Sequence, residues 1–359
     1  MSRRIQVGQV AIGDGAPVSV QSMTNTPTKD AAQTLAQIRA LAACGCDIVR
    51  LAVPDVASAE ALKEIVPASP VPLVADIHFN HDLALRSIAA GIHAVRINPG
   101  NIGSDRKVQE VAEAAGNAGI PIRVGVNAGS LPAGLYERSL AEFGDPERAL
   151  AFSLCEAAKG EVARLEACGF HDIAVSLKAS SVPVTVAAYM LFSGQSDYPL
   201  HVGVTEAGTP YRGIIKSAAG IGTLLLSGVG DTIRVSLTAD PCEEVRAGIA
   251  LLEAIGLRDA KPEIVSCPTC ARTAYDLFGM TEKVERLVAE LKSSGSLREV
   301  RKIAVMGCVV NGPGEAKDAD IGLAGTGDGR VMIFEQGRTV ATLSEADALN
   351  YLHQFLVLK

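Results

Sequence analysis

Short β-rich runs alternate with longer helical stretches from about residue 18 to about residue 260, and this alternation limits the possible folds more than any other feature. Eight strand–helix alternations in about 240 residues predict a (β/α)8 barrel, because the alternative of an open doubly wound sheet usually has fewer strands. The expected strands are Val18–Met23, Ile48–Val53, Leu73–Phe79, Ala94–Pro99, Ile122–Asn127, Ile173–Lys178, Leu200–Thr205 and Thr232–Leu237.

The ends of the barrel are predicted as well, and its domain is expected to occupy residues 1–260. Ile5–Ile12 and Val18–Met23 flank a Gly13-Asp14-Gly15 turn and are expected to pair as a hairpin that closes the bottom of the barrel. Residues 261–359 predict a small α+β domain in β-α-β-β-α order, whose last strand, Arg330–Phe334, follows a glycine-rich stretch.

Composition and charge exclude several classes of partner. The net charge of −7 argues against a general nucleic-acid or anionic-membrane surface, and the absence of Trp argues against base stacking. The N-terminus lacks the apolar core of a secretory signal, and no run reaches the ~18 to 20 apolar residues of a membrane span. The chain is therefore expected to be cytoplasmic and to meet any anionic ligand with a local cluster of Arg and Lys.

Three of the eight cysteines indicate a metal centre, since a cytosolic chain of this kind does not suggest a disulfide framework. Cys267 and Cys270 form a Cys-x-x-Cys pair that zinc, an iron–sulfur cluster or a redox pair could use. Cys308 ends a later strand and enters a glycine-rich loop in which Glu315 is the nearest carboxylate. A closed zinc site needs a fourth Cys or a His, and His353 is the only His after residue 260. Three thiolates with an open or non-cysteine fourth position favour a catalytic [4Fe–4S] cluster, with structural zinc as the alternative. The other five cysteines are assigned to packing.

Five cations stand near the ends of the predicted barrel strands, where barrel enzymes place their sites. Like charges repel unless an anion compensates them, so the group predicts a compact polyanionic ligand such as a diphosphate. The cations are Arg50, Arg96, Arg123, Lys178 and Arg234. Glu206 lies among them, near the end of the seventh strand. General acid–base catalysis on a substrate hydroxyl is one interpretation of this carboxylate, and a salt bridge that orients an arginine is the other.

Several runs of sequence resemble the 4-hydroxy-3-methylbut-2-enyl diphosphate synthase family, and the resemblance covers nearly the whole chain. The runs are Val20-Gln21-Ser22-Met23-Thr24-Asn25-Thr26, Asp76-Ile77-His78-Phe79, Arg96-Ile97-Asn98-Pro99-Gly100-Asn101, Val204-Thr205-Glu206-Ala207-Gly208, Ser266-Cys267-Pro268-Thr269-Cys270-Ala271-Arg272-Thr273 and Met306-Gly307-Cys308-Val309-Val310-Asn311-Gly312-Pro313-Gly314-Glu315-Ala316.

The resemblance implies a step of isoprenoid biosynthesis in the methylerythritol phosphate pathway. The substrate would be 2-C-methyl-D-erythritol 2,4-cyclodiphosphate, opened and dehydroxylated with two electrons from a flavodoxin or ferredoxin. The second domain would be a sulfite-reductase-like iron–sulfur domain, and the active site would be shared between the chains of a homodimer. The implied cluster ligands are Cys267, Cys270, Cys308 and Glu315, the implied acid–base residue is Glu206, and the implied substrate-binding residues are Arg50, Asp76, Arg96, Arg123, Asn127, Lys178, Arg234 and Ser236.

Two other classes of protein stay open on the residues alone. One is a non-redox barrel enzyme that acts on a phosphorylated or pterin substrate and carries a structural zinc domain. The other is an iron–sulfur sensor or scaffold without catalysis, although a sensor has no use for five cations at a barrel mouth.

Overall fold

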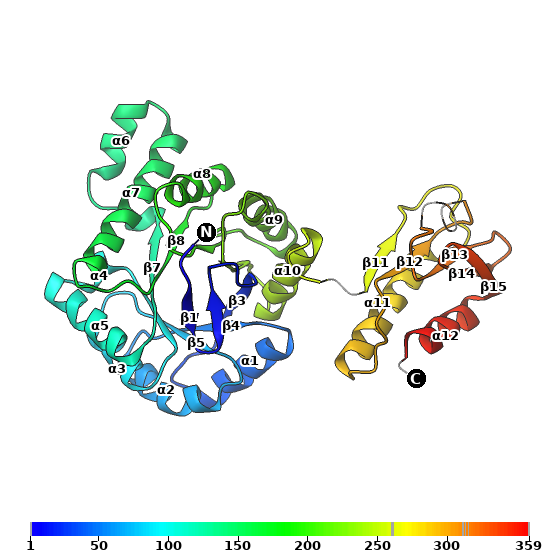
Figure 1. Cartoon of the computed structure of the whole chain (residues 1–359), viewed down its shortest axis with the longest axis horizontal. Helices are drawn as coiled ribbons and strands as arrows, with labels where there is room; N and C mark the ends of the chain where they lie inside the picture. Colours follow the sequence, from blue (N-terminus) through cyan, green and yellow to red (C-terminus); the bar gives the residue numbers. More distant parts are fainter. Residues whose placement is uncertain (1, 260–261, 311, 313, 315, 358–359) are drawn as a thin grey trace. The chain divides into compact units, whose positions relative to one another are not determined.

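The computed structural model describes residues 2–259, 262–310, 312, 314 and 316–357. The chain divides into two compact units, residues 1–258 and 259–359, each with its own hydrophobic core. The first unit is an eight-stranded parallel sheet surrounded by helices, and the second is a five-stranded sheet with two helices (Figure 1). No helix in the described part of the chain is long and apolar enough to cross a membrane.

The sheet of the first unit is a (β/α)8 barrel, as the alternation of strands and helices predicts. The sheet order is β8-β7-β6-β5-β4-β3-β10-β9, and a parallel bridge between Val175 and Leu200 joins its two edges. Tracing the strand register once round the barrel gives a stagger of eight residues, the value that characterises this fold. The strands are β3 (Ser19–Met23), β4 (Ile48–Ala52), β5 (Leu73–Asp76), β6 (Ala94–Ile97), β7 (Ile122–Asn127), β8 (Ile173–Lys178), β9 (His201–Val202) and β10 (Thr232–Ile233).

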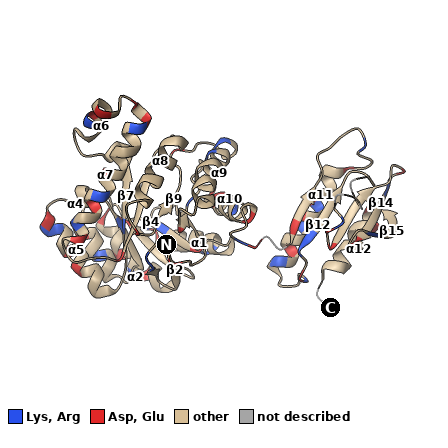
Figure 2. Cartoon of the chain, turned by 45° about the horizontal axis from the view of Figure 1, so that its top comes forward, with Lys and Arg blue, Asp and Glu red and all other residues tan. Residues whose placement is uncertain are grey.

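Most of the helices cover the outside of the barrel with an apolar side toward the outward-facing residues of the strands, and α6 packs against α7. Both signs of charge lie on outer helices such as α5 and α6 (Figure 2). Side-chain caps fix several helix starts; for example, the Asp55 carboxylate accepts the backbone N–H of Ser58 at the start of α2. The helices are α1 (Ala31–Ala43), α2 (Val56–Ala68), α3 (His81–Ala89), α4 (Pro99–Ile102), α5 (Asp105–Ala118), α6 (Leu135–Phe143), α7 (Pro146–Glu166), α8 (Val182–Ser193), α9 (Pro210–Leu226) and α10 (Pro241–Ala254).

The predicted hairpin is wrong in its pairing. The antiparallel pair is β1 (Ile5–Val7) with β2 (Val10–Ile12), and the segment after Gly13–Gly15 enters the barrel as β3. Gly8 supplies the tight turn, since its φ of 56° lies in the left-handed region. Ile5, Val7 and Ile12 pack against the first residues of the barrel strands, so the hairpin does cover the bottom of the barrel.

The second unit has a five-stranded sheet in the order β11-β12-β13-β14-β15, parallel over its first three strands and antiparallel over the last three. Its elements are β11 (Glu263–Ser266), α11 (Leu277–Ser293), β12 (Lys302–Met306), β13 (Ile321–Gly325), β14 (Arg330–Glu335), β15 (Arg338–Ser344) and α12 (Glu345–Leu356).

Two strands of the second unit, β13 and β15, were missing from the predicted β-α-β-β-α order. Strand β13 lies partly in the glycine-rich stretch, where glycine is typical of loops. Gly322 is needed there for packing, because a side chain at this position would overlap the ring of Phe334 on the neighbouring strand.

Candidate active site

Inward-facing side chains form levels in the barrel, because inward and outward residues alternate along each strand and neighbouring strands are staggered. From the bottom upward, the floor layer is Ile48, Ala94, Ala174 and Thr232; the second layer is Gln21, Val74, Arg123 and His201; the third layer is Arg50, Arg96, Ser176 and Arg234; the fourth layer is Met23, Asp76, Gly125 and Gly203; and Lys178 and Ser236 stand above them.

The structure brings all five predicted cations into this interior. Three of them share the third layer, while Arg123 lies below them and Lys178 above. Burial, and then repulsion from Arg50, lowers the pKa of both Arg123 and Lys178 well below the ordinary values. Burial likewise lowers the pKa of Arg50 to about 10. The protein therefore holds positive charges close together at an energetic cost that a bound polyanion would relieve.

Two carboxylates compensate part of this charge. Asp76 lies 3.2 Å from Nη1 of Arg96 and 3.4 Å from Nε of Arg50. Glu244, from the first turn of α10, lies 3.4 Å from Nη2 of Arg234 and accepts the hydroxyl of Ser22. Five cations and two carboxylates leave a formal excess of three positive charges among the described residues of the interior.

We predict that Asp76→Asn destabilises the protein. Burial alone would raise the pKa of Asp76, but Arg50 and then Arg96 bring it below its usual value. The stabilisation is therefore complete above about pH 4, the unfolded-state value, and is lost as the pH falls through the lowered pKa. Removing the charge leaves the buried Arg96 and the partly buried Arg50 without their carboxylate, which costs about 3 kcal/mol. Urea unfolding at pH 7 measures this loss, and an unchanged midpoint would show that Asp76 is not needed to hold the arginines.

Two glycines make room for the cations. A side chain at Gly125 would overlap the guanidinium of Arg96, which donates from Nη2 to the Gly125 carbonyl at 3.2 Å. A Cβ at Gly203 would come within 2.6 Å of the backbone carbonyl oxygen of Arg234 and within 3.2 Å of Nζ of Lys178. Both positions therefore need glycine for a packing reason and not for a turn.

The mouth of the barrel contains a cavity of about 550 Å3. Arg96 reaches it from below, Asn127 lines it from the end of β7, and His78 and Glu206 line it from the loops after β5 and β9. Glu206 is exposed and has a φ of 52°, an unusual left-handed conformation for a residue with a side chain. No ion pair within the described ranges includes Glu206, and the arginines are instead held by Asp76 and Glu244. The cavity therefore exposes the carboxylate of Glu206 and the guanidinium of Arg96 to one space, which suits proton transfer to a bound anion.

The predicted site residues differ in whether they reach the mouth cavity. Asn127 lines the mouth cavity, and Ser236 lies half-buried beyond β10, but neither Arg123 nor Lys178 lines that cavity.

The structure also shows site residues that were missed in the sequence. Gln21, His201 and Glu244 were not predicted, although all three face the cations. Alternation along β3 could have identified Gln21 as inward-facing, whereas Glu244 resembles any acidic residue in the first turn of a helix.

Cys267, Cys270 and Cys308 lie at one edge of the second sheet, where the parallel strands β11 and β12 end. The backbone N–H of Gly307 donates to Sγ of Cys267 at 3.1 Å. The turn after Cys270 is closed by Thr273, and the next residue, Ala274, donates its N–H to the Gly307 carbonyl at 2.9 Å. All three cysteines are free thiols, and the backbone segments that carry them meet at Gly307.

The donor set fits an iron–sulfur cluster in its chemistry. Free thiols at one sheet edge supply the thiolates, and a backbone N–H aimed at a cysteine sulfur is a contact that tunes such clusters. Among the described residues no three His, Cys, Asp or Glu side chains are drawn together closely enough to hold a metal ion. Glu315, the expected fourth ligand, lies outside the described residues. His353, the residue that zinc would have required, is exposed on α12.

Comparison with known proteins gives full-length matches. The protein-family model described as GcpE TIM-barrel domain matches residues 2–249. The family model described as GcpE protein C-terminal domain matches residues 263–357. The chain is 52% identical over 351 residues to a 4-hydroxy-3-methylbut-2-en-1-yl diphosphate synthase (flavodoxin) of Geobacter sulfurreducens, covering 98% of this chain and 96% of that protein. It is 50% identical to the protein of the same name from Thermodesulfovibrio yellowstonii, covering 98% and 97%.

Solved structures share the fold of the barrel at low identity. A dihydropteroate synthase of Xanthomonas albilineans has a TM-score of 0.51 and 16% identity, covering 73% of this chain and 100% of that one. An N-acetylneuraminic acid synthetase of Leptospira borgpetersenii has a TM-score of 0.50 and 12% identity, covering 80% and 98%. At these identities the likeness concerns the fold alone.

Proposed function

Because the chain belongs to the GcpE family, we propose that it is a 4-hydroxy-3-methylbut-2-enyl diphosphate synthase of the methylerythritol phosphate pathway. Its substrate is 2-C-methyl-D-erythritol 2,4-cyclodiphosphate, and its electron donor is a flavodoxin, the donor in the names of its relatives. The convergence of five cations in the barrel interior carries the substrate assignment. The alternative of a non-redox barrel enzyme on a phosphorylated or pterin substrate, with a structural zinc domain, is not favoured, because the curated relatives carry the synthase name.

The reaction is a two-electron reductive elimination. Cleavage of the ring C–O bond leaves that oxygen on the diphosphate, and loss of the neighbouring hydroxyl as water completes the carbon–carbon double bond. Two electrons and two protons enter, and one water leaves. A [4Fe–4S] cluster bound by Cys267, Cys270, Cys308 and Glu315 would supply the electrons one at a time.

The residues of the barrel bind the substrate and manage the protons. Arg50, Arg96, Arg123, Lys178 and Arg234 hold the diphosphate, with Asn127 and Ser236 as neutral hydrogen-bonding partners and Asp76 fixing two of the arginines. The carboxyl group of Glu206 donates a proton to the departing hydroxyl oxygen. Its position at the mouth cavity with Arg96 supports this role.

Apolar surface beside the functional residues supports a further part of the proposal, an active site shared within a homodimer. Phe79 lines the mouth cavity with 72% of its surface exposed, and Val310, close to Cys308, is 61% exposed. A partner chain whose cluster unit closes over the barrel would bury such residues and exclude water from the reaction. The cytoplasmic location stays a prediction.

One experiment tests the function. The protein is purified anaerobically, its iron and acid-labile sulfide are counted, and it is assayed with the cyclic diphosphate and reduced flavodoxin. We expect iron, sulfide and formation of 4-hydroxy-3-methylbut-2-enyl diphosphate. Zinc without sulfide, or no product from a protein that contains the cluster, would contradict the proposal.

A further inference from the structure

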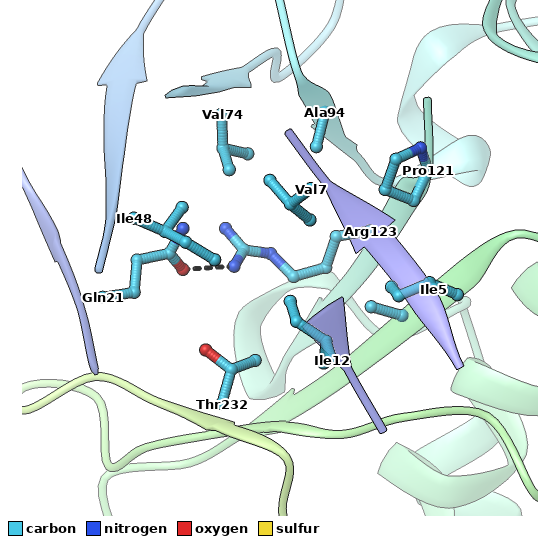
Figure 3. Close-up of a pocket in the computed structure, with 11 residues that line it drawn as sticks. Ile5, Val7, Ile12, Gln21, Ile48, Val74, Ala94, Pro121, Arg123 and Thr232 are labelled. Atoms are coloured by element: carbon cyan, nitrogen blue, oxygen red, sulfur yellow. Dashed lines mark hydrogen bonds between the residues drawn. The ribbon is translucent and has the colours of Figure 1, made fainter. Parts of the chain in front are cut away.

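Arg123 is held differently from the other arginines of the barrel. Its Nη1 donates a hydrogen bond to the side-chain carbonyl of Gln21, while Nε and Nη2 have no partner in the described structure (Figure 3). Both side chains are buried, with 6% of Arg123 and 2% of Gln21 exposed. Gln21 is therefore the one side chain that fixes this guanidinium among the described residues.

The rest of the second layer is also neutral. Val74 is apolar, and His201 is fully buried with no partner for either ring nitrogen. Burial, and then the charges of Arg123 and Lys178, keeps the pKa of His201 well below its ordinary value, so the imidazole stays uncharged. The third-layer arginines, in contrast, lie beside the carboxylates of Asp76 and Glu244.

An anion cannot reach Arg123 from the side of the hairpin at the bottom of the barrel. The space between this guanidinium and the hairpin is a cavity of about 20 Å3, which has room for about one water molecule. Its walls are mainly apolar and include Ile5, Val7 and Ile12 of the hairpin (Figure 3). In the described structure no carboxylate therefore contacts Arg123, and the nearest compensating charge named for it is that of Asp76, two layers above.

We propose that Gln21 is a positioning residue of the diphosphate site, which fixes Arg123 through a neutral acceptor and so keeps its charge available to the substrate. The inference rests on the proposed function, since it assumes that a diphosphate occupies the barrel interior. A glutamate at this position would hold the guanidinium equally well, but it would neutralise one positive charge of the site. The amide of Gln21 thus orients the guanidinium of Arg123 without cancelling its charge, whereas a carboxylate would orient the guanidinium and cancel the charge.

Two substitutions separate these tasks. Gln21→Glu keeps an acceptor for Arg123 and removes net charge, whereas Gln21→Met removes the acceptor and keeps the charge. We expect Gln21→Glu to bind inorganic diphosphate about tenfold more weakly than wild type. Its unfolding temperature should be equal or higher. Gln21→Met should unfold at a lower temperature, because a buried donor loses its acceptor, and should lose less affinity than Gln21→Glu.

The measurements are calorimetric binding of inorganic diphosphate at two salt concentrations, thermal unfolding, and KM and kcat for the cyclic diphosphate. Gln195→Glu is the matched control, because Gln195 is exposed and accepts Nζ of Lys159 at 2.9 Å. The same chemical change beside a surface cation should leave diphosphate binding and KM unaltered.

The diagnostic result is that Gln21→Glu is more stable than Gln21→Met but binds inorganic diphosphate more weakly. If Gln21 had only a structural role, the less stable variant would also be the weaker binder. Diphosphate binding by Gln21→Glu within twofold of wild type, or loss of affinity only in proportion to loss of stability, would overturn the inference. A wild-type protein that binds inorganic diphosphate but does not convert the cyclic diphosphate would count against the proposed function instead.

Discussion

Cys308→Ser is expected to remove the visible absorbance of the iron–sulfur cluster and to abolish turnover. The proposed cluster has four protein ligands, and the two cysteines and one carboxylate that are left after the substitution cannot retain it. The serine is close in size to cysteine, so a change in metal content reports the lost ligand. Iron and sulfide counts after anaerobic reconstitution, together with the absorbance spectrum, measure the effect.

Burial of Cys308 makes a second variant necessary. Only 7% of Cys308 is exposed, so its replacement could also disturb the packing of the second unit. Cys270 is exposed in the same group of thiols, and Cys270→Ser should lose the cluster without loss of helix content. Cys168→Ser, a free cysteine of the barrel unit, is the matched control and should keep full iron content. Retention of the cluster and of activity in both Cys308→Ser and Cys270→Ser would refute the cluster assignment.

The positions of the barrel strands along the chain could be predicted well from the sequence, for a physical reason. Each barrel strand is a short apolar run between helices, and its buried outward face needs the β-branched residues that mark it in sequence. The pairing of the hairpin could not be predicted in the same way. The hairpin turns at Gly8 and not at Gly13–Gly15, and its packing against the floor of the barrel joins it to residues far away in the sequence.

The cations of the candidate site could be predicted because Arg and Lys near strand ends indicate an anion site. The residues that contact these cations could not be predicted in this way. Arg123 was predicted with the other cations near a strand end, yet it is the second residue of β7 and lies beneath the third layer. Its depth follows from the stagger of the barrel, which no local pattern contains. Gln21 and Glu244 contact the cations from β3 and α10, so their roles depend on tertiary pairing.

Glu206→Gln is expected to reduce kcat by roughly a hundredfold to ten-thousandfold, the range that general acid–base catalysis contributes. The amide keeps the size of the side chain and cannot transfer a proton. Since both residues carry a Cβ, the left-handed backbone at φ 52° is equally strained in both proteins, so folding stability should not change. Glu206→Ala should show the same collapse of turnover, with the cluster intact and substrate binding near normal.

The comparison of kcat with binding distinguishes this role from an electrostatic one. If Glu206 served to orient an arginine, its loss would weaken diphosphate binding, but the ion pairs of the interior already involve Asp76 and Glu244. Single-turnover rates, KM and the affinity for inorganic diphosphate are therefore measured together, with Glu64→Gln on the exposed face of α2 as the matched control. An unchanged rate in Glu206→Gln would remove this carboxylate from the chemistry. A raised KM at an unchanged kcat would reassign it to binding, because a residue that acts only in proton transfer leaves ground-state affinity intact.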